Sequence, residues 1–162
     1  MPERPTVVVG LGNPLMKDDG AGLELLVRLA AWGDFEPEPL FVDGGTWGMN
    51  LLPVIEDAGR ILFLDAVNIG AAPGTAVRLE RDRLPRWLGV KLSPHQIDLK
   101  EVLAVAELRG RLPDDTMVIG VQPERVEMGT GLTPAVTAGL EAAVAMALST
   151  LRGWGTSAAR AA

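Results

Sequence analysis

Apolar residues occur in two alternating patterns along this chain. Short runs of consecutive apolar residues predict buried strands, and these runs cover residues 6–10, 40–43, 61–64 and 117–121. Between the runs, apolar residues recur every three or four positions, which predicts helices over residues 19–30, 47–59, 98–110 and 133–151. Strands that alternate with helices in this way are typical of a mainly parallel sheet that helices cover on both faces.

Residues 75–80 differ from the other predicted strands, because apolar and polar side chains alternate there after the turn sequence Pro73-Gly74. This alternation is typical of a half-exposed strand at the edge of a sheet. No internal repeat or linker divides the chain, so we expect one domain over residues 1–162. The tail after about residue 153 follows neither pattern, and we expect it to be flexible.

Two short sequences predict where helices begin. Thr133 followed by Pro134 is typical of an N-cap residue and a proline at the first helical position. Asp98, with Glu101 three residues later, resembles a capping box, in which the two side chains satisfy free backbone N–H groups. We therefore expect the last two long helices to start at these positions.

Composition limits the classes of function that remain. The chain has 162 residues, of which 48% are hydrophobic, enough for a domain with its own core. Its formal net charge of −6 argues against a nucleic-acid partner, since binding to phosphates requires clustered Lys and Arg. The absence of cysteine excludes disulfides, thiolate metal sites and a cysteine nucleophile. The absence of cysteine is also compatible with a reducing cytosol. With no signal peptide and no apolar run of about 18 residues visible, we expect no membrane partner.

The most informative segment is the glycine-rich turn at residues 10–22, between the first predicted strand and the first helix. Leu15 occupies the place of the third glycine of a dinucleotide-binding fingerprint, and no Gly-Lys-Ser/Thr follows as in a P-loop. Asp18 and Asp19 stand where the helix begins. We expect one of them, with Asp18 the better candidate, to cap the helix while the other points into a cleft.

Further acidic side chains follow the second and third predicted strands. Asp43 precedes Gly44-Gly45-Thr46, and we expect it to hold that turn through local hydrogen bonds, although it could also face the cleft. Asp65 ends an apolar strand, at the same edge of the sheet as the glycine turn. Taken alone, Asp65 is explained equally well by a local turn and by a functional site.

His95 is the only histidine of the chain, so any imidazole chemistry must use it. Two carboxylates and one imidazole form a ligand set that suits Zn, Ni or Fe(II) with open positions. Sequence spacing alone does not show that Asp19, Asp65 and His95 converge. A Ser-His-Asp triad that includes Ser93 is a weaker alternative, because the chain has no nucleophile elbow.

Six sequence blocks together resemble the [NiFe]-hydrogenase maturation endopeptidases, which remove a C-terminal tail from the hydrogenase large subunit after nickel insertion. The resemblance runs from Val7 to about Leu151. Its blocks, in chain order, are Gly10-Leu11-Gly12-Asn13 with Asp18-Asp19, Asp43-Gly44-Gly45-Thr46, Leu64-Asp65-Ala66, Ser93-Pro94-His95-Gln96, Gly120-Val121-Gln122-Pro123-Glu124 and Gly131-Leu132-Thr133-Pro134. Six blocks in order are far more specific than any one of them.

The resemblance implies a site and an activity. The family's metal-binding and catalytic trio falls on Asp19, Asp65 and His95, and its first ligand is Glu in some members and Asp in others. The implied fold is a three-layer α/β/α sandwich with a mainly parallel five-stranded sheet and one antiparallel edge strand. The implied enzyme is an aspartic-type endopeptidase that acts in the cytoplasm on the large-subunit precursor. Independently of the resemblance, we expect a monomer by default. The nickel is expected to come with the substrate, and no organic cofactor is expected.

Two alternatives remain at this point. The same trio could serve a non-catalytic checkpoint or chaperone that only detects nickel in the large subunit. Gly10-Leu11-Gly12-Asn13-Pro14 also resembles the opening of peptidyl-tRNA hydrolases. Those enzymes continue with a histidine-asparagine pair, where this chain has Asp18-Asp19, and the acidic charge disfavours tRNA.

Overall fold

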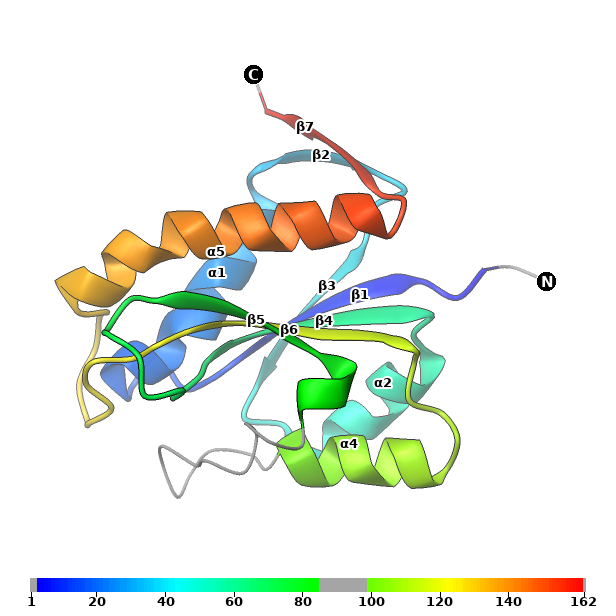
Figure 1. Cartoon of the computed structure of the whole chain (residues 1–162), viewed down its shortest axis with the longest axis horizontal. Coiled ribbons are helices and arrows are strands. Elements are labelled where there is room, and N and C mark those ends of the chain that lie inside the picture. Colours follow the sequence, from blue (N-terminus) through cyan, green and yellow to red (C-terminus); the bar gives the residue numbers. More distant parts are fainter. Residues whose placement is uncertain (1–2, 85–98, 162) are drawn as a thin grey trace.

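A five-stranded sheet forms the centre of the protein in the computed structural model, which describes residues 3–84 and 99–161 (Figure 1). The strand order is β3-β1-β4-β6-β5; the first four strands run parallel, and β5 is antiparallel to β6. This arrangement confirms the predicted sheet and its antiparallel edge strand. The strands are β1 (Thr6–Leu11), β3 (Leu40–Gly45), β4 (Arg60–Ala66), β5 (Ala76–Glu80) and β6 (Asp115–Val121).

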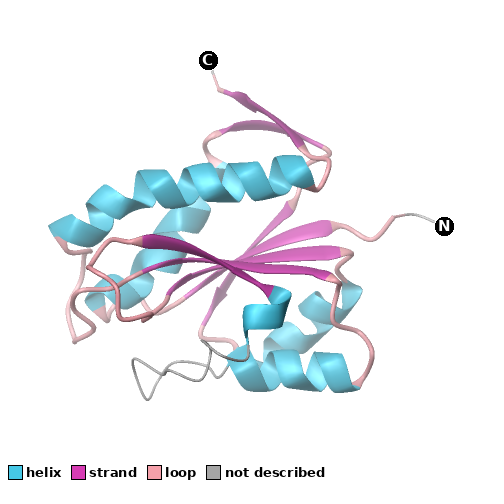
Figure 2. Ribbon diagram, in the orientation of Figure 1, coloured by secondary structure: helices cyan, strands magenta, loops and turns pink. Residues whose placement is uncertain are grey.

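Helices cover both faces of the sheet, as Figure 2 shows. Helices α1 and α5 pack on one face, and α2 and α4 pack on the other. The helices are α1 (Ala21–Ala30), α2 (Leu52–Asp57), α4 (Leu99–Leu108) and α5 (Pro134–Gly153), with short 3₁₀ helices η1 (Lys17–Gly20), η2 (Gly48–Leu51) and η3 (Arg81–Arg83). The three-layer α/β/α prediction is therefore confirmed.

The protein has one hydrophobic core on each face of the sheet. They arise because successive side chains along a strand point to opposite faces. Val8 and Leu62 face α1 and α5, whereas Val9 and Phe63, one position later, face α2 and α4. All four side chains are fully buried. The central strands are therefore apolar on both faces, which explains why their sequence shows continuous apolar runs.

The start of α1 lies unusually close to the sheet. A Cβ atom at Gly22 would collide with the carbonyl oxygens of Leu11 and Leu64, which belong to two neighbouring strands. Glycine therefore allows the first turn of α1 to rest directly on the ends of β1 and β4. This close approach fixes η1, and with it Asp18 and Asp19, against the carboxyl ends of the parallel strands.

A second, two-stranded sheet was not predicted. β2 (Gly33–Glu36) pairs with β7 (Ser157–Arg160) in antiparallel register beyond the end of α5. The expectation of a frayed tail after residue 153 is therefore wrong for residues 157–160. The ring of Trp32 holds this tail, since the guanidinium groups of Arg152 and Arg160 lie 5.6 and 5.8 Å from its centre.

α5 begins where the Thr133-Pro134 sequence predicts it. Thr133 has extended backbone angles, and Pro134 is the first helical residue. By length and composition α5 could span a membrane, but half of its apolar stretch is buried inside the fold, as in the core helix of a folded domain. The predicted capping role of Asp98 lies outside the described residues, and α4 is described from Leu99 onward.

Candidate active site

Asp19 lies in η1, directly after the glycine turn. Its side chain is buried, with 2% of the residue exposed, and its Oδ2 accepts a hydrogen bond of 2.9 Å from the backbone N–H of Asn13. Gly12 makes this geometry possible, because its φ is +128° and a Cβ atom there would collide with the carbonyl oxygen of Asp19. The turn thus folds tightly around the second acidic residue.

Asp65 is the penultimate residue of β4 and pairs in register with Gly120 of β6. It is 8% exposed, and its Oδ1 accepts a 2.8 Å hydrogen bond from the N–H of Ala66. Burial raises the pKa of the Asp65 carboxyl, and the negative charge of Asp19 raises it further. The hydrogen bond from Ala66 opposes both effects, and the pKa is raised to about 8. The two carboxylates are therefore close enough to repel each other.

Burial also raises the pKa of Asp19, opposed by the hydrogen bond from Asn13. Burial thus opposes ionisation of both acids. A divalent cation would favour their ionised forms, and carboxylate oxygens are suitable ligands for it. The donor chemistry of Asp19 and Asp65 therefore fits a shared metal.

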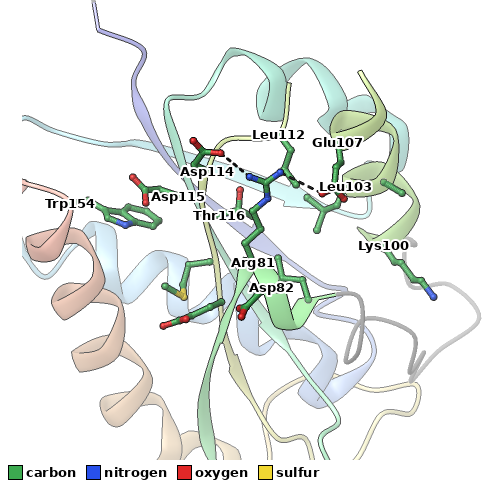
Figure 3. Close-up of a pocket in the computed structure, with 14 residues that line it drawn as sticks. Arg81, Asp82, Lys100, Leu103, Glu107, Leu112, Asp114, Asp115, Thr116 and Trp154 are labelled. Carbon is green, nitrogen blue, oxygen red and sulfur yellow. Dashed lines mark hydrogen bonds and ion pairs between the residues drawn. The ribbon is translucent and has the colours of Figure 1, made fainter. Parts of the chain in front are cut away.

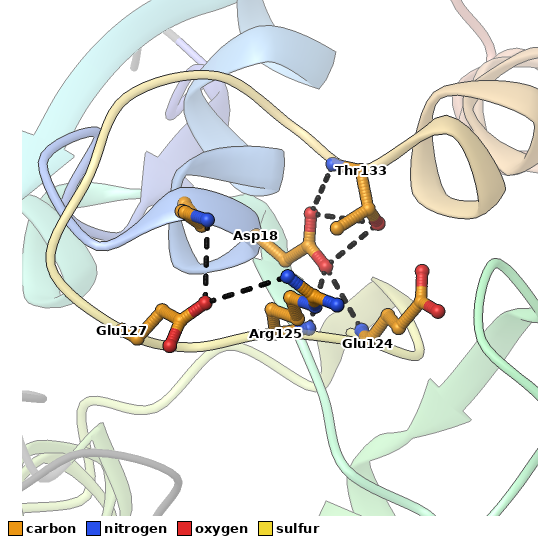
Figure 4. A network of polar contacts seen from close by, with 6 residues as sticks. Asp18, Glu124, Arg125, Glu127 and Thr133 are labelled. Carbon is orange, nitrogen blue, oxygen red and sulfur yellow. Dashed lines mark hydrogen bonds and ion pairs between the residues drawn. The ribbon is translucent and has the colours of Figure 1, made fainter.

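Asp18 does not cap α1, and its predicted role as a helix cap is wrong. Its carboxylate accepts hydrogen bonds from the backbone N–H groups of Glu124 (2.9 Å), Arg125 (2.8 Å) and Thr133 (2.7 Å), and from the Thr133 hydroxyl (Figure 4). Burial alone raises the pKa of Asp18, but these donors outweigh it and lower the pKa. Asp18 is therefore an ionised anchor for a loop more than 100 residues away.

Backbone hydrogen bonds reinforce this anchor. The N–H of Lys17 donates to the carbonyl of Gly129, the N–H of Gly129 donates to Leu15, and the N–H of Asp18 donates to Arg125. Glu127 adds an ion pair of 3.2 Å with Lys17 (Figure 4). The segment that precedes Asp19 is thus joined to the loop over residues 124–133 along its whole length.

Gln122 organises the loop that follows Asp65. Its Oε1 accepts hydrogen bonds from the N–H groups of Ile69 (2.8 Å) and Ala71 (3.2 Å), and its Nε2 donates to Asn68 (3.1 Å). Gln122 is buried and directly follows β6. It therefore holds the connection after β4 in the same way that Asp18 holds the loop before α5.

The structure brings together two of the three predicted site residues. Asp19 and Asp65 interact at the carboxyl edge of the sheet, whereas His95 lies outside the described residues. Within residues 3–84 and 99–161, no three Asp, Glu, His or Cys side chains are placed to hold a metal ion. Asp43 also lies at this edge, paired in register with Gly10, and is exposed.

A cavity lined by both charged and apolar side chains lies elsewhere. It has a volume of about 810 Å³, and Figure 3 shows Arg81 at its centre, with ion pairs to Asp114 (2.9 Å) and Glu107 (3.5 Å). Asp115 lines it at the beginning of β6, five residues before the position that pairs with Asp65. Five strand residues span roughly 16 Å. This cavity is therefore separate from the acidic pair.

Comparison with known proteins identifies the family. A family model described as hydrogenase maturation protease, HycI, matches residues 23–150. The chain belongs to the hydrogenase maturation protease family. This match begins after Asp19, so the assignment does not depend on the glycine turn. It agrees with the resemblance found in the sequence and removes the peptidyl-tRNA hydrolase alternative.

Individual relatives agree with this assignment. The chain is 39% identical over 156 residues to the hydrogenase expression/formation protein HupD of Rhodobacter capsulatus, covering 95% of this chain and 74% of the relative. It is 35% identical to the hydrogenase 2 maturation protease of Escherichia coli, covering 90% of each. The E. coli hydrogenase maturating endopeptidase HybD superposes with a TM-score of 0.88 at 34% identity, over 96% of this chain and 97% of HybD. Family membership makes this chain a peptidase of hydrogenase maturation.

Proposed function

We propose that this protein is an endopeptidase that removes the C-terminal extension of the [NiFe]-hydrogenase large subunit after nickel has been inserted. The nickel is part of the substrate, and the enzyme detects it through Asp19, Asp65 and His95. The observation that carries the proposal is the pair of buried, mutually repelling carboxylates, Asp19 and Asp65, at the carboxyl edge of the sheet. We further propose that the enzyme acts in the cytoplasm as a monomer and needs no organic cofactor.

The acidic pair supports discrimination between loaded and empty substrate. Without a cation, two buried carboxylates close together repel each other and favour protonation. When the precursor presents nickel, the cation offsets both charges, and the pair binds the substrate in ionised form. The same residues thus favour nickel-loaded precursor and offer little to a nickel-free one.

The chemistry assigns one role to each group. Substrate nickel would act as a Lewis acid on the peptide carbonyl next to it. Either Asp19 or Asp65 accepts a proton from the attacking water as general base, and the proton then passes to the amine that leaves when the C–N bond breaks; the other carboxylate remains a ligand. His95 completes the ligand set as a neutral imidazole. In this sense the enzyme is aspartic: one of its carboxylates activates water.

The test uses purified protein, nickel-loaded precursor and the mass of the precursor after incubation. Wild-type protein should shorten the precursor by one defined C-terminal fragment. Asp19→Asn, Asp65→Asn and His95→Ala should each abolish trimming, whereas Asp34→Asn, an exposed carboxylate of β2, should leave it unchanged. Circular dichroism confirms that each variant is folded.

Two results would contradict the proposal. A folded Asp19→Asn or His95→Ala protein that still trims the precursor would remove that residue from the site. An unchanged precursor mass together with a stable complex would instead support the checkpoint function, in which the same trio detects nickel without cleavage.

A further inference from the structure

Large apolar side chains are exposed around the acidic pair. Among the described residues, exposed large hydrophobic side chains include Leu15 (61%), Trp47 (51%), Met49 (50%) and Met128 (88%). All four lie in segments that connect strands to helices at the carboxyl edge of the sheet, where Asp19 and Asp65 lie; Met49 is in η2. We call these four residues the apolar rim. Exposed apolar residues gathered at one site are typical of a binding surface.

Leu15 and Met128 lie on adjacent loops. The carbonyl of Leu15 accepts the N–H of Gly129, and Met16 and Gly129 form a parallel bridge. Leu15 also stands four residues before Asp19, within the turn that wraps around it. This half of the apolar rim therefore adjoins the first catalytic carboxylate.

Trp47 and Met49 lie in the segment that follows β3. The carbonyl of Gly45 at the end of β3 accepts the N–H of Gly12, which joins this segment to the turn around Asp19. Backbone hydrogen bonds therefore connect both halves of the apolar rim to the turn that carries Asp19.

The loop that carries Met128 is held in place although its side chain is exposed. The buried Asp18 carboxylate binds both ends of the loop through the N–H groups of Glu124, Arg125 and Thr133 (Figure 4). Fixing a loop before binding lowers the entropy cost of forming a complex. Met128 is therefore presented on a preformed surface.

We propose that the apolar rim is the docking surface for the folded body of the large-subunit precursor around its nickel site. This inference rests on the proposed function. Trp and Met are enriched in the cores of protein interfaces, where charged side chains are depleted. Because the scissile bond must reach the acidic pair, the precursor surface next to it must cover the adjoining rim. The apolar rim then provides affinity for the precursor, and the carboxylates take part in the hydrolysis of the peptide bond.

The experiment compares rim substitutions with matched controls. Leu15→Glu and Met128→Glu place a charge in the proposed interface. Val27→Glu on α1 (61% exposed) and Leu108→Glu at the end of α4 (90% exposed) introduce the same charge at equal exposure outside the rim. Kinetics of trimming and binding to immobilised precursor are measured with the full-length proteins, and thermal unfolding confirms their stability.

We expect each rim variant to raise KM and weaken binding about tenfold or more, with kcat nearly unchanged, because interface anchors carry most of the binding energy. The controls should behave as wild type. Equal KM values in rim and control variants would overturn the proposal. So would rim variants that only convert a dimer of this chain into monomers, measured by light scattering. If wild-type protein binds but never trims, selective weakening by the rim variants still supports docking, although the proposed function fails.

Discussion

Replacing Asp65 with asparagine should stabilise the protein while removing its activity. The pKa of this carboxyl is raised from 3.8 to about 8, so the folded protein holds a proton that the unfolded chain releases. The contribution of Asp65 to the free energy of unfolding is fully present below pH 3.8 and is lost as the pH rises through about 8. Asparagine keeps the shape of the protonated acid and can accept the Ala66 hydrogen bond, but it never ionises.

The size of the effect follows from the range over which the proton is retained. Each pH unit corresponds to about 1.4 kcal/mol, so raising the pKa from 3.8 to about 8 gives an upper limit of about 6 kcal/mol at alkaline pH. The difference in unfolding free energy between Asp65→Asn and wild type should therefore grow steadily from pH 5 to pH 8 and then level off. It should favour the variant throughout this range.

Urea unfolding in the presence of a chelator measures this difference at several pH values. Because the comparison is between two proteins at the same pH, titration of other groups largely cancels. Asp34→Asn, an exposed carboxylate on β2, is the matched control and should show no such trend. A difference that does not change with pH, or a variant less stable than wild type at pH 9, would refute the assigned burial and charge repulsion.

Three further substitutions test the supports around the acidic pair. Gly12→Ala should abolish trimming and lower the melting temperature, because its Cβ would collide with the Asp19 carbonyl. Gly70 also has a positive φ but has open space around it, so the control Gly70→Ala should lower the unfolding free energy by only about 1 kcal/mol and keep activity. Asp18→Ala should cost roughly 3 kcal/mol or more in urea unfolding, since it leaves three backbone N–H groups without their acceptor. Because the pKa of Asp18 is lowered, that difference should be largest above pH 3.8 and shrink as the pH falls through the lowered pKa; a constant difference would argue against an ionised anchor. Gln122→Ala should cost about 2 kcal/mol in the same assay by releasing the N–H groups of Ile69 and Ala71, and an unchanged midpoint would contradict its role.

The main sheet could be predicted because its signals are local. Each central strand is apolar on both faces, and β5 alternates as an edge strand does. The β2–β7 pair could not be predicted in this way. Both strands have four residues and exposed polar positions, and their pairing depends on contacts across more than 120 residues, including Trp32 with Arg160.

The candidate site shows the same division. Asp19 and Asp65 could be proposed because Asp19 follows β1 and Asp65 lies near the end of β4, at the same edge of the sheet. The role of Asp18 could not be deduced, since a helix start and a distant loop offer the same kind of N–H donor, and its donors lie 106 to 115 residues away. Gln122 belongs to a block that resembles the family, but its side-chain partners depend on how β6 lies beside β4.

Removing nickel from the substrate tests the central claim most directly. One preparation of large-subunit precursor is divided into nickel-loaded and nickel-free halves, each is incubated with the wild-type protein, and the product masses are compared over time. Recognition of substrate nickel by Asp19, Asp65 and His95 predicts that only the loaded half loses its C-terminal extension. Trimming of both halves at the same rate would contradict it.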